Sequence, residues 1–270
     1  MALWTDSTTG IAVGYDDVGS GNVVALLHPF PFDRSMWAPQ IAELSKTYRA
    51  IAPDTFGFGE SGLPPKAWSM ESMADLLNRF FDGLKLAEPF VLGGLSMGGY
   101  IALAFAKKYS KRLRGLILAD TRADADDKEA KAKRSEAMEL VRSHGVGALL
   151  EGMLPRILCE TTRNSKPEVV QAIREIASKQ KPEAVIAALA ALRDRPDSLK
   201  DLPFFDFPVQ VIVGEEDATT PMELAETMAD YLPNVTFDSL PNAGHLSNRE
   251  TPEAFTAAVL RWLEDLQVTD

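Results

Sequence analysis

Cysteine is almost absent from this 270-residue chain, in which Cys159 is the only one. One cysteine excludes an internal disulfide, and it has no second thiolate with which to form a zinc site. Cys159 lies in the run 156–160, which is rich in apolar residues, so we expect a buried side chain rather than a reactive thiol. We therefore expect no bound metal.

Long apolar runs and an excess of positive charge are missing as well. No run approaches the ~20 residues that a membrane span needs, and residues 1–6 lack the basic and then apolar pattern of a signal peptide. Lys and Arg number 28 against 39 Asp and Glu, and nucleic acid would repel the resulting net charge of −11. We expect a cytoplasmic monomer or weak homo-oligomer whose partner is a small molecule, with no nucleic acid and no membrane.

The most informative stretch that is present is Gly94–Gly98, with the sequence Gly-Leu-Ser-Met-Gly. Residues 89–93 before it have the apolar character of a short strand, and residues 99–106 after it are the small and apolar residues of a helix. A Gly-x-Ser-x-Gly motif between a strand and a helix places its serine on a sharp turn at the carboxyl edge of a sheet. A glycine-rich turn can hold an incidental serine, but this context predicts that Ser96 is a nucleophile.

A serine hydroxyl needs a base to take its proton, and three histidines are available. His245 lies in a turn-rich loop after the strand-like residues 235–237, and loops at strand ends commonly carry catalytic groups. His144 lies in a polar helical region, where we expect a solvated side chain. His28 precedes Pro29 in a loop that has a different role. Placement and elimination together predict His245 as the base.

The base in turn needs a carboxylate that fixes its tautomer. The apolar run 209–213 predicts a buried strand, and Asp217 follows it at the same sheet edge as the serine. Glu215 and Glu216 compete for this role, although both are typical of solvated loop charges. Asp120, at the end of another strand-like run, is the remaining alternative. We prefer Asp217 because serine, aspartate, histidine is the chain order that this motif predicts.

The developing oxyanion of an acyl-transfer reaction needs backbone donors. Met97 N–H, at the start of the helix, can supply one. The other is expected from the loop after the strand-like residues 23–27. Pro29 has no amide hydrogen, so Phe30 N–H is the expected donor. The bond between Phe30 and Pro31 is a candidate cis peptide, because X-Pro bonds adopt cis in tight turns.

Strand-like and helical segments alternate along the chain, which predicts an α/β fold with a mostly parallel central sheet flanked by helices. The alternation stops after residue 120, and strand-like residues return only near residue 206. We expect a core of residues 1–120 and 206–270. Residues 121–205 are expected to form an inserted all-helical cap, or lid, over the site.

Several stretches together resemble the signatures of the α/β-hydrolase family: Leu27–Pro31, Ala52–Ser61, Gly94–Gly99, Gly214–Asp217 and Gly244–His245. The resemblance covers essentially the whole chain and is nearest to bacterial short-chain carboxylesterases with a helical cap. Enol-lactonases and cofactor-free perhydrolases are near relatives with the same triad. The resemblance implies an α/β-hydrolase fold and chemistry without a cofactor. One departure is Pro29, where the commoner loop has glycine.

The cap is expected to set the choice of substrate. Its apolar residues are candidates for lining the pocket, together with Phe30 and Met97 from the core: Met138, Met153, Leu154, Ile157 and Leu158. Packing of the cap on the core explains each of them equally well, because an apolar stripe at helical spacing is usually core. His28 belongs with the substrate-binding candidates, although we expect its ring to hydrogen-bond loop backbone rather than to catalyse.

These residues and the resemblance predict a serine carboxylesterase that hydrolyses small, short-acyl esters through an acyl-serine. A serine nucleophile argues against haloalkane dehalogenase and epoxide hydrolase chemistry, which resemble this fold but use aspartate. An enol-lactonase, carbon–carbon hydrolase or perhydrolase with the same triad is the alternative. A receptor that holds a small ligand in the same pocket is a further one.

Overall fold

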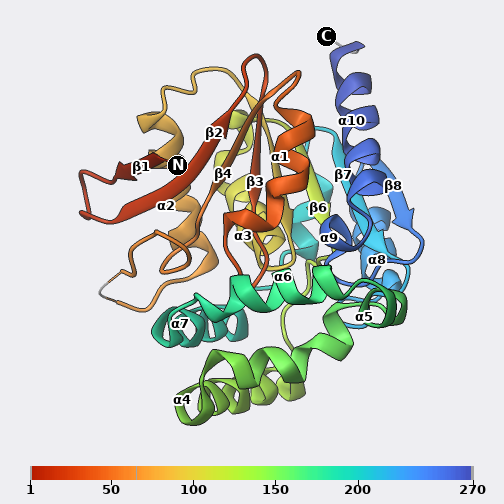
Figure 1. The fold of residues 1–270 in the computed structure, drawn as a ribbon. Helices are drawn as coiled ribbons and strands as arrows, with labels where there is room; N and C mark the ends of the chain where they lie inside the picture. Colours follow the sequence, from red (N-terminus) through yellow and green to blue (C-terminus); the bar gives the residue numbers. More distant parts are fainter. Residues whose placement is uncertain (1, 65, 269–270) are drawn as a thin grey trace.

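An eight-stranded sheet runs through the computed structural model, which describes residues 2–64 and 66–268 (Figure 1). The strand order is β1-β2-β4-β3-β5-β6-β7-β8. β2 pairs antiparallel with both its neighbours, and all the other neighbouring strands are parallel. The predicted mostly parallel sheet is confirmed. The strands are β1 (Ala2–Thr5), β2 (Ala12–Val18), β3 (Val23–Leu27), β4 (Arg49–Pro53), β5 (Phe90–Leu95), β6 (Leu113–Ala119), β7 (Val209–Gly214) and β8 (Val235–Leu240).

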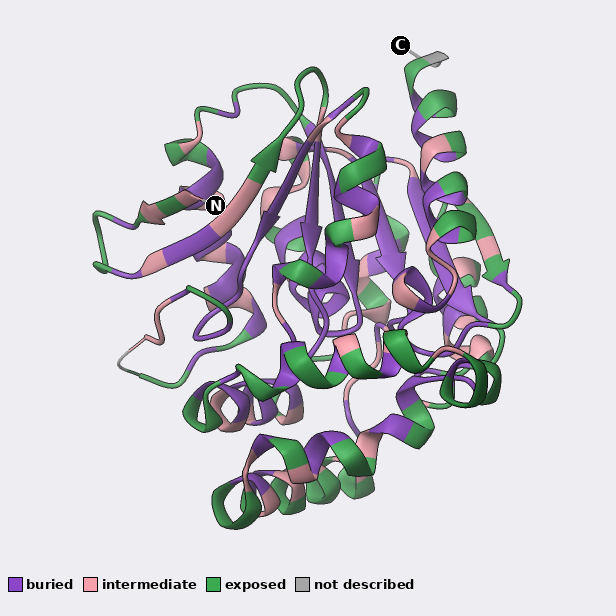
Figure 2. Ribbon diagram, viewed as in Figure 1, coloured by how far each residue is buried: buried purple, intermediate pink, exposed green. Residues whose placement is uncertain are grey.

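The central strands are buried on both faces of the sheet (Figure 2). Successive side chains of a strand point to opposite faces, so in β3 Val24 and Leu26 join one buried cluster and Ala25 and Leu27 the other. Burial on both faces explains why these strands are nearly continuous apolar runs in the sequence rather than alternating ones.

Helices cover both faces of the sheet. On one face α1 (Ala38–Leu44) contacts α10 (Pro252–Val268), and on the other α2 (Met70–Gly83) contacts α3 (Met97–Tyr109). A capping box starts α2, because the Ser69 side chain accepts from Ser72 N–H and the Ser72 hydroxyl accepts from Ser69 N–H. The remaining elements of the core are η1 (Arg34–Trp37), η2 (Ser110–Arg112), α8 (Met222–Tyr231) and α9 (Ser247–Glu250).

Every element between β6 and β7 is helical. In Figure 1 these helices lie below the sheet, at the edge where the parallel strands end. The longest of them bends at Gly145, which adopts φ 79° and ψ 176°. We call residues 128–204 the helical insertion. It comprises α4 (Lys128–Ile157), α5 (Glu160–Ser165), α6 (Pro167–Ser178), α7 (Pro182–Arg193) and η3 (Leu199–Phe204).

A buried ion pair fixes the loop that follows β4. Asp54 Oδ1 accepts from Arg34 N–H at 2.8 Å, and Asp54 Oδ2 accepts from Glu60 N–H at 3.0 Å and from the Arg34 guanidinium. Gly59 turns the chain over this carboxylate with φ 52°, and a Cβ there would lie 2.2 Å from Asp54 Oδ2. The Asp54 carboxylate therefore satisfies the backbone amides of Glu60 in this loop and of Arg34 outside it.

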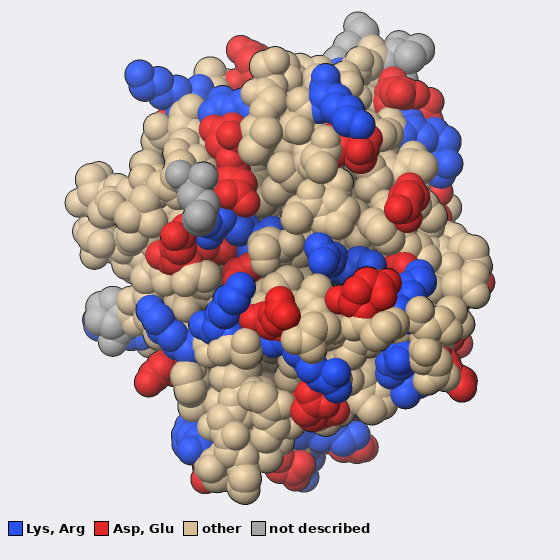
Figure 3. All heavy atoms as spheres, viewed as in Figure 1, with Lys and Arg blue, Asp and Glu red and all other residues tan. Residues whose placement is uncertain are grey.

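Acidic and basic side chains are interspersed on the face of the molecule in Figure 3, so the net charge of −11 is not gathered into one patch there. Across residues 2–64 and 66–268, no helix is both long and apolar enough to span a bilayer. The same residues contain no grouping of His, Cys, Asp and Glu that could hold a metal ion.

Candidate active site

Ser96 joins the end of β5 to the start of α3 in a strained backbone conformation, with φ 53° and ψ −114°. Such a conformation costs about 1–3 kcal/mol in a residue other than glycine, and the surrounding packing must impose it. Glycine is required on both sides of it. A Cβ on Gly94 would lie 2.2 Å from the Gly98 carbonyl, and a Cβ on Gly98 would lie 2.1 Å from the Leu27 carbonyl oxygen. The turn therefore places Ser96 at the carboxyl edge of the sheet.

His245, in the loop after β8, joins Ser96 to a carboxylate. Its Nε2 lies 2.8 Å from Ser96 Oγ, and its Nδ1 lies 2.8 Å from Asp217 Oδ2. An ionised carboxylate only accepts hydrogen bonds, so Nδ1 donates to Asp217 and Nε2 is left to accept from the serine hydroxyl. The arrangement can therefore take the proton of Ser96.

Two threonines hold the Asp217 carboxylate in place. Asp217 Oδ1 accepts from Thr219 N–H at 2.7 Å and Thr220 N–H at 2.9 Å, and Oδ2 accepts from Thr220 Oγ1 at 2.7 Å. Burial acts to raise the pKa of Asp217, but the neighbouring His245 and these donors outweigh it and hold the pKa below its ordinary value. Burial acts to lower the pKa of His245, whereas the Asp217 charge raises it above 6.5 overall. Asp217 therefore stays ionised and stabilises a protonated His245.

Asp120, the alternative acid, lies beside this chain of hydrogen bonds but does not contact His245 Nδ1. Its Oδ1 accepts from Gly214 N–H at 2.9 Å, and its Oδ2 accepts from the Ser247 hydroxyl and amide. Complete burial, and then the charge of Asp217, raise the pKa of Asp120 well above its ordinary value. Asp120 thus joins the end of β6 to the strand and loop that carry Asp217 and His245.

The predicted oxyanion donors lie on the two segments that meet at Ser96. Met97 is the first residue of α3, and Phe30 follows β3 and lines the cavity above the serine. The Phe30–Pro31 bond is cis, as expected. Behind this loop the His28 ring is fully buried: Nδ1 donates to the Pro29 carbonyl at 3.0 Å, and Nε2 accepts from Thr55 N–H at 2.9 Å.

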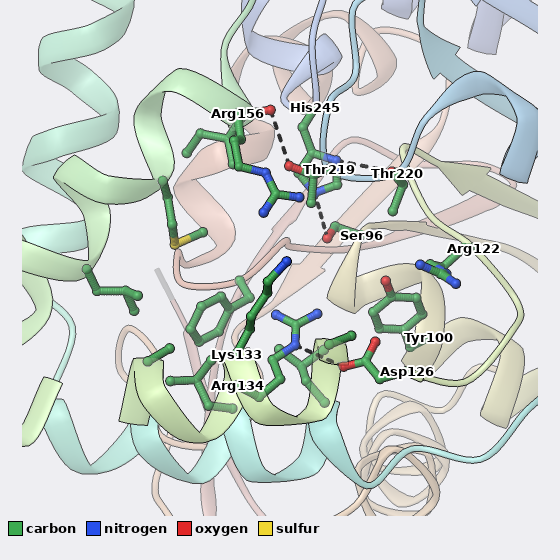
Figure 4. Close-up of a pocket in the computed structure, with 18 of the residues that line it drawn as sticks. Ser96, Tyr100, Arg122, Asp126, Lys133, Arg134, Arg156, Thr219, Thr220 and His245 are labelled. Atoms are coloured by element: carbon green, nitrogen blue, oxygen red, sulfur yellow. Dashed lines mark hydrogen bonds and ion pairs between the residues drawn. The ribbon is translucent and has the colours of Figure 1, made fainter. Parts of the chain in front are cut away.

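A cavity of about 410 Å³ opens between the sheet edge and the helical insertion, with Ser96 and His245 in its wall. Figure 4 shows Lys133, Arg134 and Arg156 reaching toward it from α4. Apolar side chains of α4 and α7 form another part of the wall: Leu149, Met153, Ile157, Leu189 and Leu192.

Of the residues expected to line the pocket, the structure brings Phe30, Met153 and Ile157 to the cavity. Others do not reach it, and this corrects the expectation. They are Met97, Met138, Leu154, Leu158 and His28. The apolar residues among them face the interior and pack against buried side chains. The His28 ring instead hydrogen-bonds the backbone of its own loop.

Several lining residues were not anticipated. Tyr100 lies one helical turn after the serine, a spacing that could have indicated it. Thr219 and Thr220 follow Asp217 closely enough to suggest donors to its carboxylate. No local pattern indicated Leu189 and Leu192, because the alanine-rich α7 reaches the cavity only through the packing of the insertion.

Ion pairs hold the segment between β6 and β7 together, and buried polar contacts attach it to the core. Asp126 bonds to both Arg134 and Arg195, and the Arg195 side chain is only 3% exposed. The buried carboxylate of Glu250 accepts from Gly244 N–H, beside His245, and from Cys159 N–H in the insertion, both at 2.8 Å. The loop that carries the histidine is therefore tied to the insertion.

Cys159 has the buried position that we expected, with an exposure of 3%. Its Sγ contacts Thr162 Oγ1 and the Asn242 carbonyl, and burial raises the pKa of the thiol. It is not among the described residues that line the cavity above Ser96.

A family model described as the alpha/beta hydrolase family matches residues 24–258 of this chain. This chain is an alpha/beta hydrolase. A structure of a thermophilic esterase from Thermogutta terrifontis, with malate bound, is similar to this hydrolase at 46% identity and a TM-score of 0.93, covering 98% of this chain and 97% of that one.

Lactonases are also similar to this hydrolase. The enol-lactonase from Burkholderia xenovorans LB400 is 28% identical with a TM-score of 0.88, over 94% of this chain and 97% of that one. The 3-oxoadipate enol-lactonase 2 of Acinetobacter baylyi is 26% identical over 92% of each chain. These similarities support hydrolase activity and confirm the predicted fold and family.

Proposed function

We propose that this hydrolase is a serine carboxylesterase that cleaves small, short-acyl carboxylic esters through an acyl-serine intermediate. The observation that carries the proposal is the hydrogen-bonded chain Ser96–His245–Asp217, whose serine and histidine lie in the wall of a cavity lined by both apolar and charged side chains. The similarity to the Thermogutta terrifontis esterase, at 46% identity, supports the same reaction class.

In the first step Ser96 Oγ attacks the ester carbonyl while its proton passes to His245 Nε2. The carbonyl oxygen becomes an oxyanion, which the Phe30 and Met97 amides stabilise with hydrogen bonds. His245 Nε2 then gives the proton to the alkoxy oxygen as the carbon–oxygen bond breaks, so that alcohol leaves and an acyl-serine remains. Asp217 stabilises the imidazolium that forms between these events.

In the second step water replaces the alcohol. His245 Nε2 takes a proton from the water as its oxygen attacks the acyl carbon, and the same amides hold the second oxyanion. The bond between Ser96 Oγ and the acyl carbon then breaks as Oγ takes the proton back from His245. The carboxylic acid leaves, and the free serine is restored. The cycle balances without a metal or organic cofactor.

We assign the chemistry to a core of residues 1–120 and 206–270, and the choice of substrate to a helical cap of residues 121–205. The cap residues Leu149, Met153 and Ile157 present apolar surface to the cavity, and Lys133, Arg134 and Arg156 of the same helix also line it. The apolar part of the wall supports the proposal of an uncharged acyl group. A volume of about 410 Å³ lies near the lower end of the range for small-molecule sites, and this supports a small ester.

Hydrolysis of p-nitrophenyl esters from acetate to laurate tests the proposal, with wild type compared with Ser96→Ala. We expect turnover of acetate and butyrate and a loss of about 10⁶-fold in kcat in the variant, because the covalent step is removed. Circular dichroism of the variant checks that the fold is retained. Wild-type protein that is folded yet inactive on all of these esters would contradict the proposal.

Lactone hydrolysis by the same residues is the second candidate, favoured by the similarity to two enol-lactonases. A lactone is an internal ester, so Ser96 and His245 would act on it without rearrangement. Comparing kcat/KM for five- and six-membered lactones with that for open esters of equal carbon number separates the two. A consistent preference for the lactones would replace the carboxylesterase proposal.

A further inference from the structure

Tyr100 lies between two cavities. One is the cavity of about 410 Å³ that contains Ser96 and His245, and Tyr100 is part of its wall. A second cavity, of about 240 Å³, also has Tyr100 in its wall. Apolar side chains make up much of the lining of this second cavity: Met70, Leu103, Ala104 and Ala123.

The two cavities follow one another along the same face of α3. Tyr100 lies four residues after Ser96, and its N–H donates to the Ser96 carbonyl at 3.1 Å. Leu103, Ala104 and Lys107 lie three, four and seven residues beyond Tyr100, on the same helix face, and all three line the second cavity. The direction from the serine into the second cavity therefore passes the Tyr100 ring.

The Tyr100 ring is held in this position. The guanidinium carbon of Arg195 lies 4.3 Å from the ring centroid. Arg195 is itself held by Asp126, by the Leu192 carbonyl and by the Asp124 carbonyl. In Figure 4 the Tyr100 hydroxyl lies on the side of Ser96. The ring is thus a supported wall rather than a free side chain.

We propose that the Tyr100 ring closes the acyl end of the active-site cavity and limits this enzyme to short acyl chains. Behind the ring, the second cavity is an acyl channel that Tyr100 keeps shut. The ring limits the acyl group rather than the alcohol, because the acyl group stays bonded to Ser96 Oγ in the intermediate, one helical turn from Tyr100. The inference rests on the proposed esterase function and names its substrate limit.

The test is the ratio of kcat/KM for p-nitrophenyl octanoate to that for p-nitrophenyl acetate. In Tyr100→Ala we expect this ratio to rise at least tenfold over wild type, since each methylene that enters apolar surroundings contributes about fourfold. Tyr100→Phe keeps the ring and is expected to keep the wild-type ratio. Tyr100→Leu, the milder variant if the alanine variant does not fold, is expected to give an intermediate ratio.

A second change shows where the extra chain goes. Ala104 lines only the second of the two cavities and is half-buried, so Ala104→Phe fills that cavity without replacing a core side chain. In the double variant Tyr100→Ala/Ala104→Phe the gain on octanoate should disappear. The inference is overturned if the octanoate-to-acetate ratio of kcat/KM in folded Tyr100→Ala stays at the wild-type value. It is also overturned if the ratio is still raised in the double variant. Wild-type protein inactive on every ester would instead refute the proposed function itself.

Discussion

On the sheet side of the active-site cavity, Ser96, Asp217 and His245 are each less than a tenth exposed and are joined by hydrogen bonds of 2.8 Å. On the insertion side, Lys133 and Arg156 are exposed. The sheet side is built at the ends of β5, β7 and β8, where paired backbone fixes each turn. The insertion side is built on helices of the segment between β6 and β7.

Under the proposed function, the two sides have different tasks. Reacting groups must be held within a fraction of an ångström, and strand ends provide this rigidity. A wall that selects substrates can tolerate adjustment, because it contributes shape and apolar surface. Changes on the sheet side are therefore expected to affect rate and stability strongly, and changes on the outer surface of the insertion only weakly.

The largest effect after loss of the nucleophile is expected for Asp217→Asn. The amide cannot hold His245 in the tautomer that accepts from Ser96, so kcat should fall about 10⁴-fold. Asp120→Asn is the matched control: Asp120 is buried nearby, but it bonds to Gly214 and Ser247 rather than to the histidine. Its kcat should stay within about tenfold of wild type. Equal losses in steady-state assays of the two variants would show that the acid is wrongly assigned.

A smaller but clear effect on stability is expected for Asp54→Asn. The substitution leaves the buried Arg34 without its closest carboxylate and weakens the loop after β4, which should cost about 3 kcal/mol. Asp16→Asn is the control, because Asp16 lies 3.3 Å from the same guanidinium but is 30% exposed. Urea denaturation of both variants measures the difference. Equal stability losses would show that the buried and the exposed ion pair contribute equally to stability.

Below the pKa of His245, kcat/KM is expected to fall about tenfold for each pH unit. His245 must be neutral to accept the Ser96 proton, and its pKa is raised above 6.5 because the charge of Asp217 outweighs the effect of burial. Activity should therefore fall as the pH decreases through a midpoint above 6.5. A midpoint below 6.5 would mean that burial dominates and that Asp217 contributes less charge than the geometry indicates.

The smallest effect is expected on the outer surface of the insertion. Arg174 forms two hydrogen bonds to Glu151, at 2.7 and 2.9 Å, but the two side chains are 44% and 54% exposed. Water screens such a pair, so Arg174→Ala should leave the midpoint of thermal unfolding and kcat/KM unchanged within error. A clear drop in the unfolding midpoint would mean that the insertion depends on its surface pairs more than the core does.

Local sequence predicted the strand ends and the helical character of the insertion well, but it predicted poorly which helix faces line the cavity. The run 209–213 became β7 with Asp217 just beyond it, because a buried parallel strand needs a continuous apolar sequence. β1 gave no clear signal, since its residues are alternately half-buried and exposed over too short a length. In the insertion, the sequence identified apolar helical residues but not which of them face the cavity. Met153 does and Leu154, next to it, does not.

The sequence by itself predicted Ser96, Asp217 and His245 as the catalytic residues, together with the cis Phe30–Pro31 bond. Each prediction depends on local chemistry: glycines at a tight turn, a carboxylate after an apolar strand, and an X-Pro bond, which adopts cis readily. Only the tertiary structure decided which helix faces line the cavity, and it alone placed Arg195 on the Tyr100 ring and Glu250 between Gly244 and Cys159. These contacts join residues far apart in the chain. Their geometry depends on how the insertion packs against the core, and no local pattern contains that information.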